Sequence, residues 1–150
     1  MENRSFNFFR FEDLRVYHKA LDYSRFVNNM LKSIANDDVV NQTKSAFAKA
    51  AISISINIAE GSGRNKNQFI YYLKMAKSSI RECVVYSTSL LNEGYISQES
   101  FDECKQYLIE LSKMVGALIT SLQRGPRRNY EPQTDADEEE DLPNLEEHNA

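Results

Sequence analysis

The sequence has few of the residues on which most catalytic and metal sites depend. Among its 150 residues there are two cysteines, Cys83 and Cys104, and two histidines, His18 and His148. Their spacing does not match a zinc site, and no Glu-x-x-His pair suggests a di-iron centre. No glycine-rich phosphate loop occurs, and no catalytic constellation accompanies either histidine. We therefore expect no enzyme activity, no metal site and no cofactor.

Long apolar runs are also missing. No stretch of 18 apolar residues occurs, so we predict no membrane span. The N-terminal residues lack the basic-then-apolar order of a signal peptide. Cys83 and Cys104 fall in predicted helices, where we expect buried free thiols in a reducing compartment, and hence a cytoplasmic protein. With 41% hydrophobic residues, the chain has the composition of an ordinary globular domain.

Charge is distributed unevenly along the chain. All 18 Lys and Arg lie in residues 1–128 together with 13 of the 22 acidic residues, which gives this part a net charge of +5. Residues 129–150 carry the other nine acidic residues. We predict a folded domain in residues 1–124 and a disordered acidic tail in residues 125–150, which has too few apolar residues to offset the entropy of ordering. We hypothesise that the tail folds back onto the basic surface.

Residues 51–64 form the most informative segment. The alternation of Ile and Ser from Ile52 to Ile58 is typical of a half-buried strand. However, five polar residues recur at steps of three or four, which places them on one stripe of an α-helix. We interpret the segment as a buried helix with a polar stripe, although a strand stays open on the pattern alone. The stripe contains Lys49, Ser53, Asn57, Glu60 and Arg64.

This polar stripe has a structural interpretation. Buried polar groups are costly unless they are satisfied, so we expect the stripe to fix how the helix packs, with an ion pair between Glu60 and Arg64. We also expect Gly61 and Gly63 to supply left-handed backbone conformations at the helix end.

Apolar residues at helical spacing predict four helices, over residues 13–35, 39–61, 65–92 and 97–123. We expect Asn36-Asp37-Asp38 to break the first helix and to cap the second, and Ser97 to open the fourth. The three connections are short, so the fold class we predict is all-α, as an antiparallel up-down-up-down four-helix bundle.

A basic stripe lies on the third predicted helix. Lys74, Lys77 and Arg81 are three and four residues apart, and Arg64 and Lys66 precede them. No acidic residue occurs between Arg64 and Arg81. Such a field attracts nucleic acid through counterion release, without base specificity. An ordinary solvated helix face remains the alternative interpretation.

A weaker basic patch lies on the first predicted helix, where Arg15 and Lys19 are accompanied by Arg25 but diluted by Asp22. These patches leave two classes of function open. One is a nucleic-acid-binding protein, and the other is a protein–protein scaffold whose basic face binds an acidic protein partner.

Three blocks of the sequence resemble one known family, the four-helix-bundle proteins called the S23 or 23S rRNA intervening-sequence protein family. The resemblance runs from about Phe11 to Gln123. A basic pair of the family is replaced here by Ala48 and Lys49, which argues against phosphate binding by that helix. The three blocks are Phe11-x-x-Leu14-x-Val16-Tyr17-x-Lys19-Ala20, Ser53-Ile54-x-x-Asn57-Ile58-Ala59-Glu60-Gly61-x-Gly63-Arg64 and Phe69-x-x-x-Leu73-x-x-Ala76-x-x-Ser79-x-x-Glu82.

The resemblance implies a cytoplasmic bundle that assembles into a cyclic homo-oligomer, a pentamer. Family members occur as reading frames inside rRNA intervening sequences. Related proteins are accessory factors of retroelement reverse transcriptases and bind nucleic acid through a basic surface. The resemblance thus implies RNA or DNA as a partner, together with a reverse transcriptase or a ribosomal component.

Overall fold

The computed structural model describes residues 8–124, which form four long helices and no strand. A short 3-10 helix, η1 (Arg10–Asp13), precedes α1 (Arg15–Lys32). The other three helices are α2 (Asp38–Ser62), α3 (Lys66–Asn92) and α4 (Gln98–Arg124). The predicted helices are therefore all present, and α2, α3 and α4 begin and end within one residue of their predicted bounds.

The first predicted helix, over residues 13–35, was too long at both ends. Leu14 has an extended backbone, with φ −80° and ψ 122°, which separates η1 from α1. At the other end, the amide of Ser33 bonds to the carbonyls of Met30 and Leu31 in a closing turn. Local hydrogen bonding thus ends α1 before Ala35, although the apolar spacing continues to Ile34, which is buried beyond the helix.

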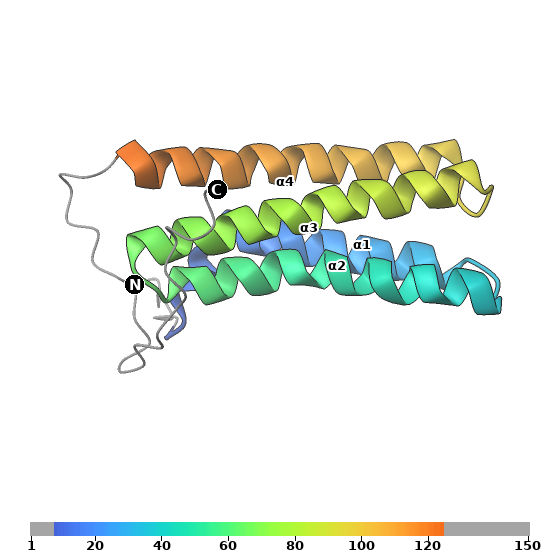
Figure 1. The fold of residues 1–150 in the computed structure, drawn as a ribbon, viewed down its shortest axis with the longest axis horizontal. Coiled ribbons are helices and arrows are strands. Elements are labelled where there is room, and N and C mark those ends of the chain that lie inside the picture. Colours follow the sequence, from blue (N-terminus) through green and yellow to red (C-terminus); the bar gives the residue numbers. More distant parts are fainter. Residues whose placement is uncertain (1–7, 125–150) are drawn as a thin grey trace, which may run out of the picture.

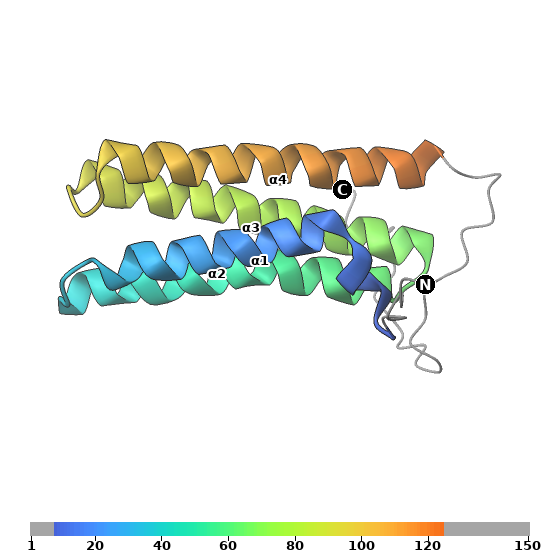
Figure 2. The ribbon, with the colours of Figure 1, turned by 180° about the vertical axis from the view of Figure 1, so that it is seen from behind.

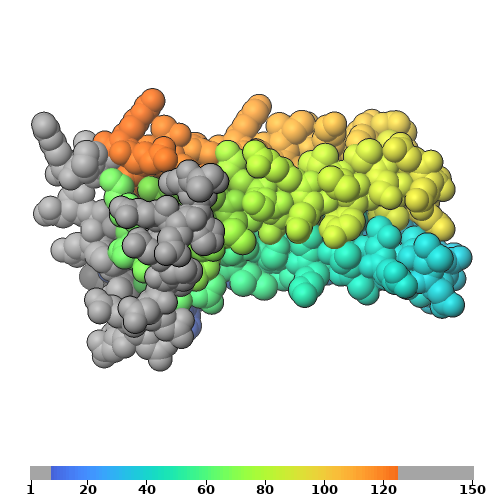
Figure 3. Space-filling view, in the orientation of Figure 1, coloured from blue at the N-terminus to red at the C-terminus, as the bar shows by residue number. Residues whose placement is uncertain are grey.

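The four helices lie lengthwise beside one another and enclose a single core. Helix α2 packs against α1 and α3, and α4 packs against α3 and α1. Figures 1 and 2 show the α1–α2 and α3–α4 turns at one end of the molecule and the α2–α3 turn at the other. The face seen in Figure 3 is formed by α2, α3 and α4, with α3 in the middle.

The Ile-Ser segment belongs to α2, so the strand interpretation is excluded. Ile54 and Ile58 are fully buried, whereas the side chain of Ile56 is 52% exposed. A strand would place all three on one face. The helix begins where the Asp37 carboxylate accepts hydrogen bonds from the amides of Val39 and Val40, which satisfies two unpaired donors of its first turn.

The two glycines at the end of α2, Gly61 and Gly63, do not adopt the left-handed backbone that we predicted. Gly63 has φ −83°, and Gly94, in the α3–α4 turn, is the only glycine of residues 8–124 with a positive φ, 79°. Gly61 is needed for a different reason. A Cβ at this position would lie 2.7 Å from Cβ of Tyr72 and 2.8 Å from Cδ2 of Phe69, so the glycine allows α2 and α3 to approach closely.

Candidate nucleic-acid interface

The basic stripe of α3 lies on the side of that helix that faces α4. Lys74 and Arg81 are exposed, and Lys77 is partly buried. The Lys77 ammonium lies 3.9 Å from the position that a Cβ would take at Gly116 of α4. Because Lys74, Lys77 and Arg81 share one face of the helix, the stripe runs along the seam between α3 and α4.

No carboxylate neutralises this stripe within residues 8–124. The two ion pairs of this part of the chain are Lys19–Glu110 and Arg64–Glu60, and neither involves a residue of the stripe. The stretch from Lys66 to Arg81 contains no Asp or Glu. The positive charges are therefore available to an anionic partner.

Sequence reasoning missed a further cation beside this stripe. Lys113 lies on α4, three residues before Gly116, and is exposed. Residues three apart share a helix face, so Lys113 lies one turn along α4 from the point that Lys77 reaches. The spacing of Lys113 along the sequence gives no signal for this, because its proximity to the stripe depends on how α4 packs against α3.

Arg64 is placed differently from the stripe. Its guanidinium lies 3.6 Å from the Glu60 carboxylate, as predicted, and 6.0 Å from the centre of the Tyr72 ring. Its side chain is only 16% exposed. Arg64 thus packs where α2 and α3 meet. Lys66, in the first turn of α3, is also partly buried.

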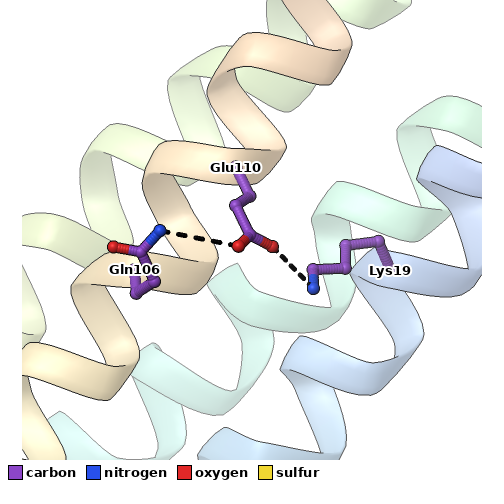
Figure 4. Close-up of polar contacts among 3 residues, drawn as sticks. All are labelled: Lys19, Gln106 and Glu110. Carbon is purple, nitrogen blue, oxygen red and sulfur yellow. Dashed lines mark hydrogen bonds and ion pairs between the residues drawn. The ribbon is translucent and has the colours of Figure 1, made fainter.

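The predicted patch on α1 is divided by an ion pair. The Lys19 ammonium lies 2.6 Å from the Glu110 carboxylate of α4 (Figure 4). It also lies 5.0 Å from the centre of the Tyr107 ring. The hydrogen bond from Lys19 lowers the pKa of Glu110, and the same bond raises the pKa of Lys19. Glu110 also accepts a hydrogen bond from Gln106. Arg15 is exposed, so it is the member of this pair of candidates that remains open to solvent.

The polar stripe of α2 makes contacts within its helix and with α3. The Ser53 hydroxyl lies 2.6 Å from the Ser79 hydroxyl of α3, and the Asn57 amide donates to the Ser53 carbonyl at 2.8 Å. Lys49 is exposed. Four of the five residues, Ser53, Asn57 and the Glu60–Arg64 pair, thus have partners that suit a packing role.

Two buried thiols lie in the core rather than in an accessible site. Cys83 and Cys104 are both fully buried, as predicted, and the Tyr23 hydroxyl lies 3.4 Å from Sγ of Cys104. Burial raises the pKa of Cys83 to about 12 and also raises that of Cys104. Both cysteines therefore stay protonated at neutral pH, the form that is a poor nucleophile and metal ligand.

The other features that we considered as functional sites are His18, metal-binding clusters and membrane-spanning helices. His18 is exposed and bonds through Nε2 to the Glu12 carbonyl. No group of three His, Cys, Asp or Glu that could hold a metal ion occurs in residues 8–124. Over the same residues, no helix has the length and apolar character needed to cross a membrane. His148 and residues 125–150 lie outside the part that the structure describes.

Residues 12–117 match the family model described as 23S rRNA-intervening sequence protein. The chain therefore belongs to this family, as the three sequence blocks indicated. A protein of the S23 ribosomal protein family from Bacteroides thetaiotaomicron VPI-5482, described as having unknown function, has the same fold, with a TM-score of 0.62. The two are 22% identical over 70% of this chain and 95% of the other. Neither description names an enzyme, and no curated protein matches the chain.

Proposed function

We propose that the protein is a non-enzymatic nucleic-acid-binding protein, acting as an accessory component of a ribonucleoprotein. The observation that carries the proposal is the unneutralised stripe of Lys74, Lys77 and Arg81 on the α3–α4 seam. The family description refers to sequences within 23S rRNA, which favours RNA over DNA as the physiological partner. Lys66 and Lys113 extend the surface, and Arg15 is a candidate for a separate contact on α1.

The stripe suits binding to the phosphate backbone. Three cations along two turns of helix lie on one face with a rise of about 1.5 Å per residue. Neighbouring cations of the stripe are therefore about 4.5 to 6 Å apart along the helix axis, and the three together span roughly 10 Å. Lysine ammonium groups act as point charges without base preference. Binding of this kind is independent of sequence and depends strongly on salt.

The experiment is a titration of fluorescently labelled RNA and DNA of matched sequence at increasing salt. The proposal predicts that log Kobs falls linearly with log salt, with a slope of about −0.7 to −0.9 per phosphate contact. Lack of binding to either nucleic acid at low salt, together with salt-sensitive binding of polyglutamate, would instead establish the rival function of a scaffold for acidic proteins.

We further propose that the chain forms an antiparallel up-down-up-down bundle that assembles as a cyclic homo-oligomer, with five copies as the number implied by the family resemblance. Figure 1 supports the alternating helix directions. Large apolar side chains on the outer surface support self-association, since Phe8 is 75% exposed, Val85 65% and Ile56 52%. Native mass spectrometry at several protein concentrations counts the copies, and a monomer at all of them contradicts this assembly.

We also propose that the protein is cytoplasmic, because free buried thiols suit a reducing compartment.

A further inference from the structure

The acidic end of the chain follows α4, which ends beside the start of α3, the helix that carries the basic stripe. Helix α4 ends at Arg124, at the same end of the bundle at which α3 begins with Lys66 (Figure 1). Five residues after Arg124, the sequence enters residues 129–150, which contain nine acidic residues and no Lys or Arg. The chain therefore carries a polyanion of its own, attached next to its most basic surface.

Within residues 8–124, no carboxylate forms an ion pair with Lys74, Lys77 or Arg81. On the neighbouring face of α4, Lys113 adds a further cation. The carboxylate of Glu110 is engaged by Lys19. Glu82, next to Arg81 in sequence, points to a different face, because consecutive residues of a helix are about 100° apart. An acidic segment of the same chain thus has no carboxylate of the bundle to displace from the stripe.

The length of the acidic segment is sufficient for the contact. Helix α3 rises about 22 Å between Lys66 and Arg81. The 26 residues after Arg124 can span up to about 85 Å when extended. Residues 129–150 can therefore reach every cation of the stripe from their point of attachment. A tethered segment also acts at an effective concentration on the order of millimolar.

We propose that residues 129–150 bind the α3–α4 basic stripe when nucleic acid is absent and compete with it for Lys74, Lys77 and Arg81. The competition rests on the proposed function, whereas the contact itself does not. Nine tethered carboxylates disfavour short or weakly charged ligands. A long nucleic acid displaces the segment, because it offers more phosphates than the segment offers carboxylates and releases more counterions. The segment therefore restricts binding at the stripe to long, highly charged ligands.

Carbodiimide cross-linking of the full-length protein without nucleic acid tests the contact. This reagent joins carboxylates to amines only where the two groups touch. We expect mass spectrometry to find residues 129–150 joined to Lys66, Lys74 or Lys77 at low salt and not at high salt. Two lysines that are exposed but lie off the stripe serve as internal controls. They are Lys49 of α2 and Lys32, the last residue of α1, which lies at the other end of the molecule from the end of α4. Equal joining to the control lysines, or none to the stripe, overturns the proposal.

A full-length variant with an uncharged tail tests the competition. The control keeps all nine acidic residues of 129–150 but in shuffled order, so that charge and length are unchanged. Relative to this control, we expect the uncharged variant to bind RNA about tenfold more tightly at low salt, with the difference disappearing as salt screens the contact. Equal affinity of the two proteins at low salt overturns the competition. If neither binds nucleic acid, the proposed function fails, while the cross-links still decide the contact. The variant replaces Glu131, Asp135, Asp137, Glu138, Glu139, Glu140, Asp141, Glu146 and Glu147 with Asn or Gln.

Discussion

The Lys19 ammonium of α1 lies 2.6 Å from the Glu110 carboxylate of α4, and this ion pair joins the first helix of the bundle to the last (Figure 4). The pair has a consequence for function as well as for the fold. It neutralises one of the two candidate residues of the α1 patch, whereas Lys74, Lys77 and Arg81 have no such partner within residues 8–124. The α3–α4 seam therefore keeps three cations that form no ion pair within residues 8–124.

Replacing Lys19 by Gln tests whether nucleic acid binds the α3 stripe rather than the α1 patch. Because Glu110 already neutralises Lys19, we expect the K19Q variant to bind RNA within about twofold of the unmodified protein, whereas K77Q binds more weakly. Both variants lose one positive charge, so they are matched in net charge. Fluorescence anisotropy at low salt measures the two affinities, and an equal loss in both contradicts the assignment of the site to α3.

The same ion pair predicts a dependence of stability on pH. The pKa of Glu110 is lowered in the folded protein, so its contribution to stability is present above the ordinary value of 4.5 and is lost as pH falls through the lowered value. Both side chains are partly exposed, so we expect a small effect that salt reduces further. Urea unfolding of wild type and E110Q should differ at pH 7 and converge at acid pH. A difference that grows toward acid pH contradicts this reading.

Two glycines provide a matched test of helix packing. A Cβ at Gly61 would meet Tyr72 at 2.7 Å, so we expect G61A to destabilise the protein by roughly 1–3 kcal/mol through overpacking between α2 and α3. At Gly116 the nearest atom is the flexible Lys77 ammonium, at 3.9 Å. Here alanine gains helix propensity, and we expect stabilisation of up to about 1 kcal/mol. Urea midpoints measure both changes, and equal effects of the two substitutions argue against close packing at Gly61.

The buried cysteines predict a loss of stability at alkaline pH. The folded pKa of Cys83 is raised from 9.0 to about 12, and that of Cys104 is also raised. Above pH 9 the unfolded thiols lose their protons while the folded ones keep them, so ionisation favours the unfolded state and stability falls between about pH 9 and 12. A variant with C83A and C104A should show a shallower decline over this range. Parallel curves for the two proteins contradict the prediction.

Reactivity of the thiols gives an independent check. Because Cys83 and Cys104 are fully buried and protonated at neutral pH, a thiol reagent should modify neither in the folded protein and both in urea. Fast labelling of one cysteine under native conditions would show that the core around Tyr23 opens locally.

The sequence predicted the helices well because each depends on local information. The stripe from Lys49 to Arg64 repeats every three or four residues, which was enough to favour a helix over a strand for Ile52 to Ile58. The beginning of α1 was less predictable, because the extended backbone of Leu14 interrupts a pattern that the apolar residues continue. The prediction for Gly61 was wrong because its need for glycine comes from Tyr72 on another helix.

The candidate site could be predicted only in part. Lys74, Lys77 and Arg81 lie on one helix, so their common face followed from their spacing. The pairing of Lys19 with Glu110, and the position of Lys113 near the stripe, depend on which helices are neighbours and on their register. Information of that kind is distributed over the whole bundle and is not contained in any one segment.

The most direct test of the account neutralises the α3 stripe and measures the salt dependence of RNA binding. The test variant combines K74Q, K77Q and R81Q, and the control combines K105Q, K32Q and K49Q, three exposed cations elsewhere with the same total change in charge. We predict that the slope of log Kobs against log salt becomes shallower by roughly 2 to 3 in the test variant, because up to three phosphate contacts are lost, and stays nearly unchanged in the control. Equal slopes in the two variants would contradict nucleic-acid binding by the α3–α4 seam.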